Sequence, residues 1–416
     1  MSPLPRPGNH HCIPHTNHYP EIDSPGDLTM PARPALLAAV LLTAPVHAQW
    51  TAEILGPADG SRSIANGVHA NQQAGSLESP ANAPRRAVLW SGDPGFMIDL
   101  HPAGSTTSEA FAAHAGQQGG SADGRACYWT GSAASFTLLS NDSSDVWAVF
   151  NGQQGGDRVV GGSVRASLWS GTPESWIDLS LPGFGASAVF GMSQGQQVGL
   201  YLLNAHWNFR ACMWSGSGAS FVDLHPSGFS SSTAYGCGDG QQVGTADSRA
   251  ALWTGSAASF TDLTPPGVGL IGAALAVCGG IQVGSIAPSP ASYPRAALWR
   301  GSAATFEDLS TALPPTAISS HATGVWTDGQ SILVSGQMRI GDEHFAVLWR
   351  QARCGTSDFN NDGDIGTDQD IEAFFACLGG HCCPTCYPGA DFNADGDTGT
   401  DADIESFFRA LGGQPC

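Results

Sequence analysis

Two acidic runs near the C-terminus hold the residues best suited to chemistry. Residues 358–364 read DFNNDGD and residues 391–397 read DFNADGD, at an offset of 33 residues. Oxygen atoms at positions 1, 3, 5 and 7 of such a run can surround a hard cation, and a glycine at position 6 allows the sharp turn. We therefore predict two calcium sites. The predicted ligands are Asp358, Asn360, Asp362 and the carbonyl of Asp364 in the first run, and Asp391, Asn393, Asp395 and the carbonyl of Asp397 in the second.

The pattern does not fix which acid closes each loop. Position 12, where a bidentate acid is usual, holds Gln369 in the first run and Ala402 in the second. Asp370 and Asp403 directly precede the apolar residue that opens a predicted helix, so we favour them as closing ligands in loops one residue longer than usual. The acids two residues earlier, Asp368 and Asp401, are predicted to cap the two helices.

Each run leads into a short predicted helix with one apolar face that ends at a Gly-Gly pair. A loop–helix unit repeated twice, without an entering helix, resembles a type I dockerin. It is more similar to the cysteine-bearing dockerin-like tails of secreted planctomycete proteins. The resemblance covers residues 354–416 and implies calcium-dependent docking to a cohesin-like partner or a surface anchor; the alternative is a calcium-stabilised cap without a partner. The apolar residues are Ile371, Phe374, Phe375 and Leu378, then Ile404, Phe407, Phe408 and Leu411.

The cysteines divide between this tail and the rest of the chain. An even set of six in the tail predicts three disulfides in a secreted protein, with open connectivity, although the C-x-x-C spacing also allows zinc. Outside the tail, Cys237 and Cys278 occupy one repeat position and could be bridged, and Cys127 and Cys212 occupy another; small buried thiols are the alternative. The tail cysteines are Cys354, Cys377, Cys382, Cys383, Cys386 and Cys416.

Most of the remaining chain is built from near-copies of residues 249–263, RAALWTGSAASFTDL. A recurrence every 39 to 50 residues indicates a repeat architecture. Each copy follows a Gln-Gln-Val-Gly block, which is degenerate in the seventh copy at residues 331–334. The marker tryptophans are Trp90, Trp129, Trp169, Trp214, Trp253, Trp299 and Trp349.

Each repeat contains four short runs bounded by Gly, Ser, Pro and Asn, which predict four strands and hence one propeller blade. If Trp253 pairs with Phe260, then Arg249 lies diagonal to Asp262, which predicts an ion pair repeated around the ring. The last repeat lacks its final strand, and residues 50–55 can supply it. We therefore predict an all-β, seven-bladed propeller closed by the N-terminal strand, followed by the small helical module. The repeats over residues 50 to about 350 resemble the bacterial extracellular HAF repeats, which implies architecture but little about activity.

The chain divides into four predicted segments. Residues 1–29 are predicted to be disordered and to result from a start assigned too early, 30–48 to be a signal peptide, 49–353 the propeller and 354–416 the calcium-binding module. A His-rich metal-binding leader is the alternative for the first segment. The net charge is −20 with no lysine, so nucleic acid is excluded as a partner. No membrane span follows the signal peptide, and we expect the protein to be secreted.

An enzyme would need convergent acids, bases or metal ligands outside the repeat pattern. The acids and histidines that lie outside the repeat pattern form no recognisable motif, so we assign no catalytic residue. Two carboxylates meeting at one end of the channel would indicate the alternative function, an extracellular carbohydrate-active hydrolase or lyase. The leftover histidines are His69, His101, His114, His206, His225, His321 and His344.

Insertions that break the repeat are the candidate binding surface. Exposed aromatic rings there suit a carbohydrate or peptide ligand, although loop aromatics can also cover a blade edge. The sequence thus favours a non-catalytic binding or scaffold propeller attached through its tail. The insertion residues are Tyr201, His206, Trp207 and Phe209 in 200–209, Tyr293 in 285–294, and His321, Trp326, Arg339 and His344 in the last repeat.

Overall fold

The structure, a computed structural model, describes residues 50–412 with gaps at 57–60, 80–82, 92–95, 204–207, 269, 329–330, 353–356, 361, 365, 384–388 and 394–397. Several predicted features lie outside the described residues. They are the leader and signal peptide (1–48), the cysteines Cys354, Cys386 and Cys416, the ligands Asp395 and Asp397, and the insertion residues His206 and Trp207.

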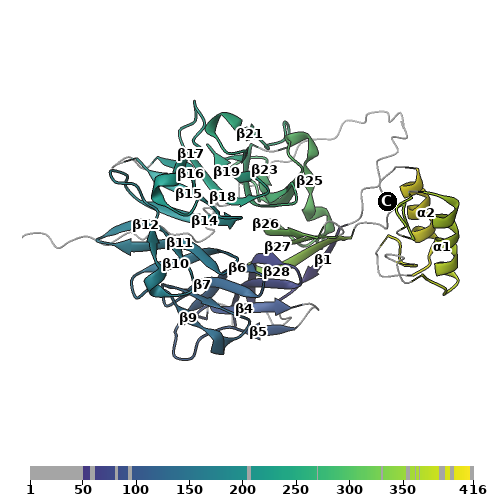
Figure 1. The fold of residues 1–416 in the computed structure, drawn as a ribbon, viewed down its shortest axis with the longest axis horizontal. Helices are drawn as coiled ribbons and strands as arrows, with labels where there is room; N and C mark the ends of the chain where they lie inside the picture. The colour runs from purple at the N-terminus through teal and green to yellow at the C-terminus, as the bar shows by residue number, and fades with distance from the viewer. Residues whose placement is uncertain are drawn as a thin grey trace, which may run out of the picture. The chain divides into compact units, whose positions relative to one another are not determined.

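Seven antiparallel four-stranded sheets form the blades, each written here from the innermost strand outward (Figure 1). Blade one contains β2 (Arg62–His69), β3 (Gln72–Glu78), β4 (Arg86–Ser91) and β5 (Met97–Asp99). Blade two contains β6 (Ser108–His114), β7 (Gln117–Ala122), β8 (Arg125–Trp129) and β9 (Thr137–Leu138). Blade three contains β10 (Ser144–Phe150), β11 (Gln153–Val160), β12 (Ser163–Trp169) and β13 (Ile177–Asp178). Blade four contains β14 (Ser187–Ser193), β15 (Gln196–Leu202), β16 (Phe209–Trp214) and β17 (Val222–Asp223).

Blades five to seven repeat the plan. Blade five contains β18 (Ser232–Gly238), β19 (Gln241–Ala246), β20 (Arg249–Trp253) and β21 (Thr261–Asp262). Blade six contains β22 (Ile271–Cys278), β23 (Ile281–Ala287), β24 (Arg295–Trp299) and β25 (Glu307–Asp308). Blade seven contains β26 (Ser319–Thr327), β27 (Ser331–Ile340), β28 (Glu343–Ala352) and β1 (Thr51–Ile54). Short 3₁₀ turns are η1 (Ala133–Ser135), η2 (Pro173–Ser175), η3 (Gly218–Ser220), η4 (Ala257–Ser259), η5 (Ala303–Thr305) and η6 (Leu309–Ala312).

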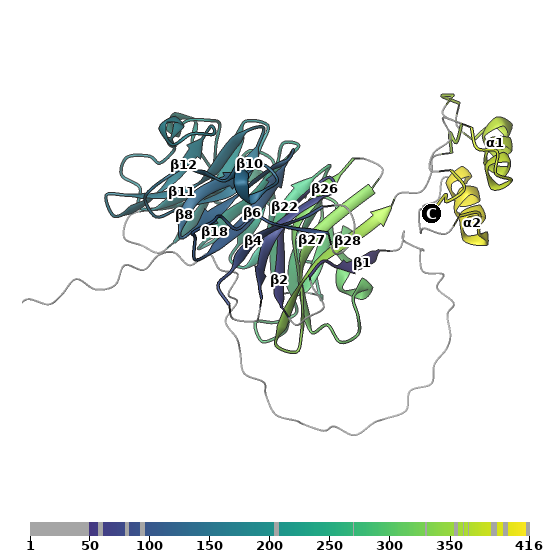
Figure 2. The same cartoon turned by 90° about the horizontal axis from the view of Figure 1, so that it is seen from below.

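The ring is closed by the N-terminal strand, as the sequence predicts. Strand β1 pairs antiparallel with β28 and places Ala52 opposite Trp349 (Figure 2). The innermost strands contact one another in chain order from β2 to β26, and β26 contacts β2 again. This pairing covers the edge of blade seven that would otherwise expose unpaired backbone groups.

The repeat tryptophans are the largest side chains of the inter-blade cores. All seven are at most 1% exposed. The predicted register is confirmed, because Ala251 lies opposite Asp262 and the rings of Trp253 and Phe260 lie 6.0 Å apart. The predicted Arg–Asp ion pair is confirmed in five blades, at Arg86–Asp99, Arg165–Asp178, Arg210–Asp223, Arg249–Asp262 and Arg295–Asp308.

The Gln-Gln-Val-Gly block has a steric and a polar function. A Cβ on Gly244 would overlap the carbonyl oxygen of Thr233 on the neighbouring inner strand, and the equivalent glycine of every other blade is equally confined. The second glutamine links blades: Gln154 Nε2 donates to Gln117 Oε1 of the preceding blade at 3.0 Å, and its Oε1 accepts from the Gly171 amide. The block therefore fixes strand spacing and blade packing together.

The seventh copy of this block does not lie where the sequence places it. Val334, and not Ile332, faces Trp349 in the position of the second glutamine, and Gly336 supplies the confined glycine. The block is thus residues 333–336, two residues later than predicted. Without glutamines to mark it, only the pairing with β28 identifies the register.

The C-terminal module contains helices α1 (Asp368–Leu378) and α2 (Asp401–Leu411) around a phenylalanine core. Phe374 and Phe407 stack with ring centroids 4.0 Å apart. Thr367 and Thr400 are the N-caps, so the predicted caps Asp368 and Asp401 are wrong: each occupies the first helical position. A threonine hydroxyl takes the capping role because Asp370 and Asp403 complete a capping box with it.

Candidate functional site

The side-chain oxygens of the first predicted calcium loop accept hydrogen bonds from the backbone of the same loop. The Asp362 amide donates to Asp358 Oδ1 and to Asn360 Oδ1, both at 3.0 Å. The Gly363 amide donates to Asp358 Oδ2 at 3.1 Å, and Gly363 has a φ of 96° that favours glycine. Two carboxylates and one amide oxygen therefore gather around the turn. An all-oxygen donor set of this kind fits a hard cation such as calcium.

Asp370 and Asp403, the predicted closing ligands, are fully buried at the first turns of α1 and α2. Asp370 Oδ1 accepts from the amides of Phe359 and Asn360, and its Oδ2 accepts from the amide and hydroxyl of Thr367. Asp403 makes the equivalent bonds to Asn393 and Thr400. Each carboxylate thus joins a loop to its helix.

The calcium assignment stays a prediction for both loops. Among the described residues, no group of three or more His, Cys, Asp or Glu side chains is arranged to hold a metal ion. In the first loop, the candidate ligands are the carboxylates of Asp358 and Asp362 and the side-chain amide oxygen of Asn360. In the second loop, Asp391 and Asn393 are described, whereas the next two ligands are not.

The helices do not bury the whole predicted apolar face. Phe374 and Phe407 are fully buried, whereas Phe375 and Phe408, one residue later, are 46% and 49% exposed. The two exposed rings are neighbours, with centroids 6.2 Å apart. Phe374 and Phe375 both belong to the predicted apolar face, but only Phe374 enters the core, which takes the positions of Asp370, Phe374 and Cys377.

The cysteine predictions have mixed outcomes. Cys377 and Cys382 form a disulfide, and Cys383 is also disulfide-bonded. The suggested Cys237–Cys278 bridge is wrong, because both thiols are free, as are Cys127 and Cys212. Burial raises the pKa of the Cys237 thiol to about 12, so it remains an inert, protonated group.

A belt of side chains from β-bulges surrounds the propeller axis. Every inner strand carries a bulge at the same place, followed by a glycine or alanine whose small size lets the next inner strand approach. Phe111 and Trp147 stack with centroids 4.3 Å apart, and Phe190 and Tyr235 continue the belt. The seven bulge residues, all half-buried, are Asn66, Phe111, Trp147, Phe190, Tyr235, Leu275 and Thr323.

Next to the belt, Asp145 and Asp157 lie opposite each other in blade three. The Trp147 indole donates to Asp157 Oδ1 at 2.6 Å. Burial, with the charge of Asp145, raises the pKa of Asp157 from 3.8 to about 7. Burial and the Glu109 charge also raise the pKa of Asp145, which is hydrogen-bonded to Ser121. The leftover acids therefore include one cross-strand carboxylate pair near the axis.

At the other ends of the inner strands, four rings follow one another on blades seven, one, two and three. We call this set the aromatic rim: Trp326, His69, His114 and Phe150. Centroid distances are 6.1 Å from Trp326 to His69, 4.4 Å from His69 to His114 and 4.4 Å from His114 to Phe150. All four are half-buried. In the sequence these histidines have no motif; they could be found only by aligning the inner strands, because each lies three residues after its bulge.

The aromatic residues of the insertions differ in exposure: Tyr201 is buried and Tyr293 is exposed. Tyr201 is only 2% exposed and stacks on Phe184, so its predicted exposure is wrong. It is buried because β15 extends beyond the repeat and Phe221 closes over it. Tyr293 is 53% exposed and lies 5.9 Å from the Arg339 guanidinium.

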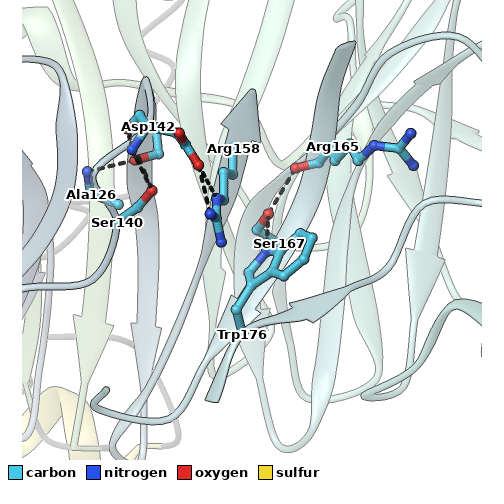
Figure 3. Close-up of polar contacts among 8 residues, drawn as sticks. Ala126, Ser140, Asp142, Arg158, Arg165, Ser167 and Trp176 are labelled. Carbon is cyan, nitrogen blue, oxygen red and sulfur yellow. Dashed lines mark hydrogen bonds and ion pairs between the residues drawn. The ribbon is translucent and has the colours of Figure 1, made fainter. Parts of the chain in front are cut away.

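Blade three also carries a cation–aromatic contact (Figure 3). Arg158 Nε and Nη2 donate to Asp142 Oδ2 at 2.8 and 2.6 Å, and the guanidinium lies 4.7 Å from the Trp176 ring centre. Trp176 Nε1 donates to Ser167 Oγ. Trp176 replaces the phenylalanine of the repeat. Since every group here has a partner, we assign the contact a structural role.

No family profile matches the sequence, and no curated protein matches it. Solved structures do match by shape. An oligogalacturonate lyase in complex with manganese has 10% identity and a TM-score of 0.46, and the match covers 72% of this chain and 93% of the lyase. The extracellular domain of the one-component system BT4673 from B. thetaiotaomicron has 10% identity, a TM-score of 0.46 and coverage of 76% and 42%. A TolB from Agrobacterium tumefaciens has 8% identity, a TM-score of 0.35 and coverage of 70% and 90%. Likeness of this degree supports no statement about activity.

Proposed function

We propose that this protein is a secreted, non-catalytic binding or scaffold propeller, attached to a surface or a complex through a calcium-dependent dockerin-like tail. The observation that carries the proposal is the exposed pair Phe375 and Phe408. Both repeats of the tail leave a large ring in water at the same helical position, although the preceding phenylalanine is buried. Exposed apolar groups that lie together favour a contact surface for a partner.

Secretion is supported by the chemistry of the tail. The Cys377–Cys382 disulfide suits an oxidising compartment, where such bonds persist. None of the described helices is long and apolar enough to cross a membrane. The predicted signal peptide at residues 30–48 would direct the chain through a membrane and be removed.

The calcium role rests on the first loop, where Asp358, Asn360 and Asp362 converge on one turn. Calcium would hold this turn against the start of α1 and thereby fix the helix that presents Phe375. Because the two repeats are equivalent, the same role is proposed for Asp391, Asn393, Asp395 and Asp397, with Asp370 and Asp403 closing the loops. The partner is then a cohesin-like domain or a surface anchor.

The test is calorimetric titration of calcium into the secreted, oxidised chain, with Asp358→Ala and Asp391→Ala variants. We expect two sites, each lost with its own variant. The calcium-loaded chain is then used as bait against cell-surface fractions of the host, with Phe375→Ser/Phe408→Ser as the control for docking. Absence of calcium binding by the oxidised chain would contradict the dockerin-like assignment.

A carbohydrate-active enzyme is the second candidate, and the pair Asp145 and Asp157 favours it. A carboxyl group with a pKa near 7 can transfer protons at neutral pH. We place catalysis second because Trp147 and Ser121 already bind these carboxylates, which gives both a structural role. Release of reducing ends from plant or algal polysaccharides, abolished in Asp157→Asn, would reverse this order.

A further inference from the structure

The aromatic rim combines flat apolar surface with hydrogen-bonding nitrogen atoms. Adjacent rings are inclined by 42° to 59°, comparable to the rotation from one blade to the next, so each ring has a similar orientation in its own blade. The equivalent positions on the other three blades hold the small residues Ser193, Gly238 and Cys278. Four consecutive blades therefore present rings at this end of the propeller, and the other three present small residues.

The rim carries no formal charge at neutral pH. Burial lowers the pKa of His69, and burial with the proximity of His69 lowers the pKa of His114. No carboxylate or guanidinium among the described residues contributes to either shift. A neutral imidazole has one donor and one acceptor nitrogen. The Asn151 amide donates to His114 Nδ1 at 3.5 Å, so His114 keeps Nε2–H as a donor to a hydroxyl group.

The backbone next to the two histidines is strained. Ala70 and Ala115, which directly follow His69 and His114, have φ values of 51° and 47°. Asn151, Asp239 and Gly279 occupy this turn position in three other blades, and these residue types tolerate positive φ better than alanine does; Gln194 occupies it in blade four.

We infer that the aromatic rim binds a neutral saccharide unit of an extracellular glycan. The apolar face of the sugar ring contacts Trp326, its hydroxyl groups bond to the imidazoles of His69 and His114, and Phe150 borders the far end of the site. An acidic glycan is opposed by the net charge of −20, and a cation finds no carboxylate in the rim. This inference rests on the proposed role of the propeller as a binding unit and names its ligand.

The test is affinity electrophoresis of the full, oxidised chain in calcium buffer, through native gels containing β-glucan, xyloglucan or galactomannan. Polygalacturonate serves as the charged comparison. We expect retardation by at least one neutral glycan, and a dissociation constant raised by roughly tenfold or more in Trp326→Ala, equivalent to about 1.4 kcal/mol. His114→Phe keeps a ring and removes the nitrogen atoms, so it separates hydrogen bonding from stacking and should also weaken retention. Phe96→Ala, an exposed ring outside the rim, should leave retention unchanged.

Thermal unfolding by circular dichroism verifies that each variant is folded. The inference is overturned if no neutral glycan retards the folded chain, if polygalacturonate or a peptide matrix is preferred, or if retention survives both rim variants. Calcium-dependent docking of the tail is measured on the same samples. If the chain docks but binds no glycan, only the proposed glycan site at the aromatic rim is overturned. If the chain does not dock, the result counts against the proposed attachment through the tail.

Discussion

At the scale of single residues, the indole N–H of most repeat tryptophans has no hydrogen-bond acceptor in the described part of the chain. Among the described residues, six of the seven have a buried indole N–H without an acceptor, whereas Trp349 donates to the carbonyl of Leu309 at 3.0 Å. Replacing Trp253 by Phe removes an unpaired donor along with some apolar area, so we expect a change in unfolding free energy below about 1.5 kcal/mol. Trp349→Phe also loses a hydrogen bond and should cost about 1 kcal/mol more. Urea denaturation of the Trp253→Phe and Trp349→Phe variants measures both changes, and equal losses of unfolding free energy would contradict the argument.

Asp157 gives a prediction about pH. Its pKa is about 7 in the folded chain and near 3.8 when unfolded, so the folded state binds the proton more tightly. The contribution of Asp157 to stability must therefore fall as pH rises from about 4 to about 7. Asp157→Asn should be more stable than the unaltered chain at pH 8, and the difference should vanish near pH 4. Denaturant midpoints at pH 4, 6 and 8 measure it, and a difference that is constant with pH refutes the assignment.

The repeated ion pairs and the belt differ in how far the sequence predicts them. Arg249 and Asp262 follow from strict alternation along two paired strands, and the structure confirms their contact. Trp147 and Phe190 do not follow, since each lies on a bulge, where alternation is interrupted. Likewise, His69 and His114 become neighbours only through ring closure, which brings separate blades together. Local patterns therefore predict contacts within a blade, whereas contacts between blades need the three-dimensional ring.

At the scale of the strand, the glycine of the Gln-Gln-Val-Gly block is a steric requirement. Gly244→Ala would force a Cβ into the carbonyl of Thr233, so we expect loss of more than about 3 kcal/mol or failure to fold. Gly218→Ala is the matched control, because the equivalent turn position is alanine in blades two and five and its nearest neighbour would be 3.3 Å away. That variant should be neutral or gain about 0.4–1 kcal/mol from reduced unfolded-state entropy. Melting temperatures distinguish them, and a harmless Gly244→Ala would contradict the packing.

Blade number and closure could be predicted because strand β1 supplies the one element that the last repeat lacks. The sequence pattern places the seventh block two residues too early, because Val334 replaces the glutamine that marks the others. In the tail, the spacing of Ile371, Phe374, Phe375 and Leu378 predicts the helix but not its buried side. That side depends on where the second repeat packs, as the stacking of Phe374 on Phe407 shows.

At the scale of the whole molecule, the propeller and the tail have separate hydrophobic cores. The phenylalanine cluster of Phe359, Phe374, Phe392 and Phe407 includes no propeller residue. We therefore expect two unfolding transitions in calorimetry. Calcium should stabilise only the tail. At a free concentration one hundred times the dissociation constant, it should raise the tail's free energy of unfolding by about 2.7 kcal/mol.

The variants make this calcium prediction specific. Asp358→Ala removes a carboxylate of the first loop and should reduce the calcium-dependent shift, whereas Asp342→Ala, an exposed acid of the propeller, should not. Chelation by EDTA should lower the tail transition and leave the propeller transition in place. If calcium moved both transitions equally, or neither, the ion would not be part of the tail, and the two acidic runs would need another explanation.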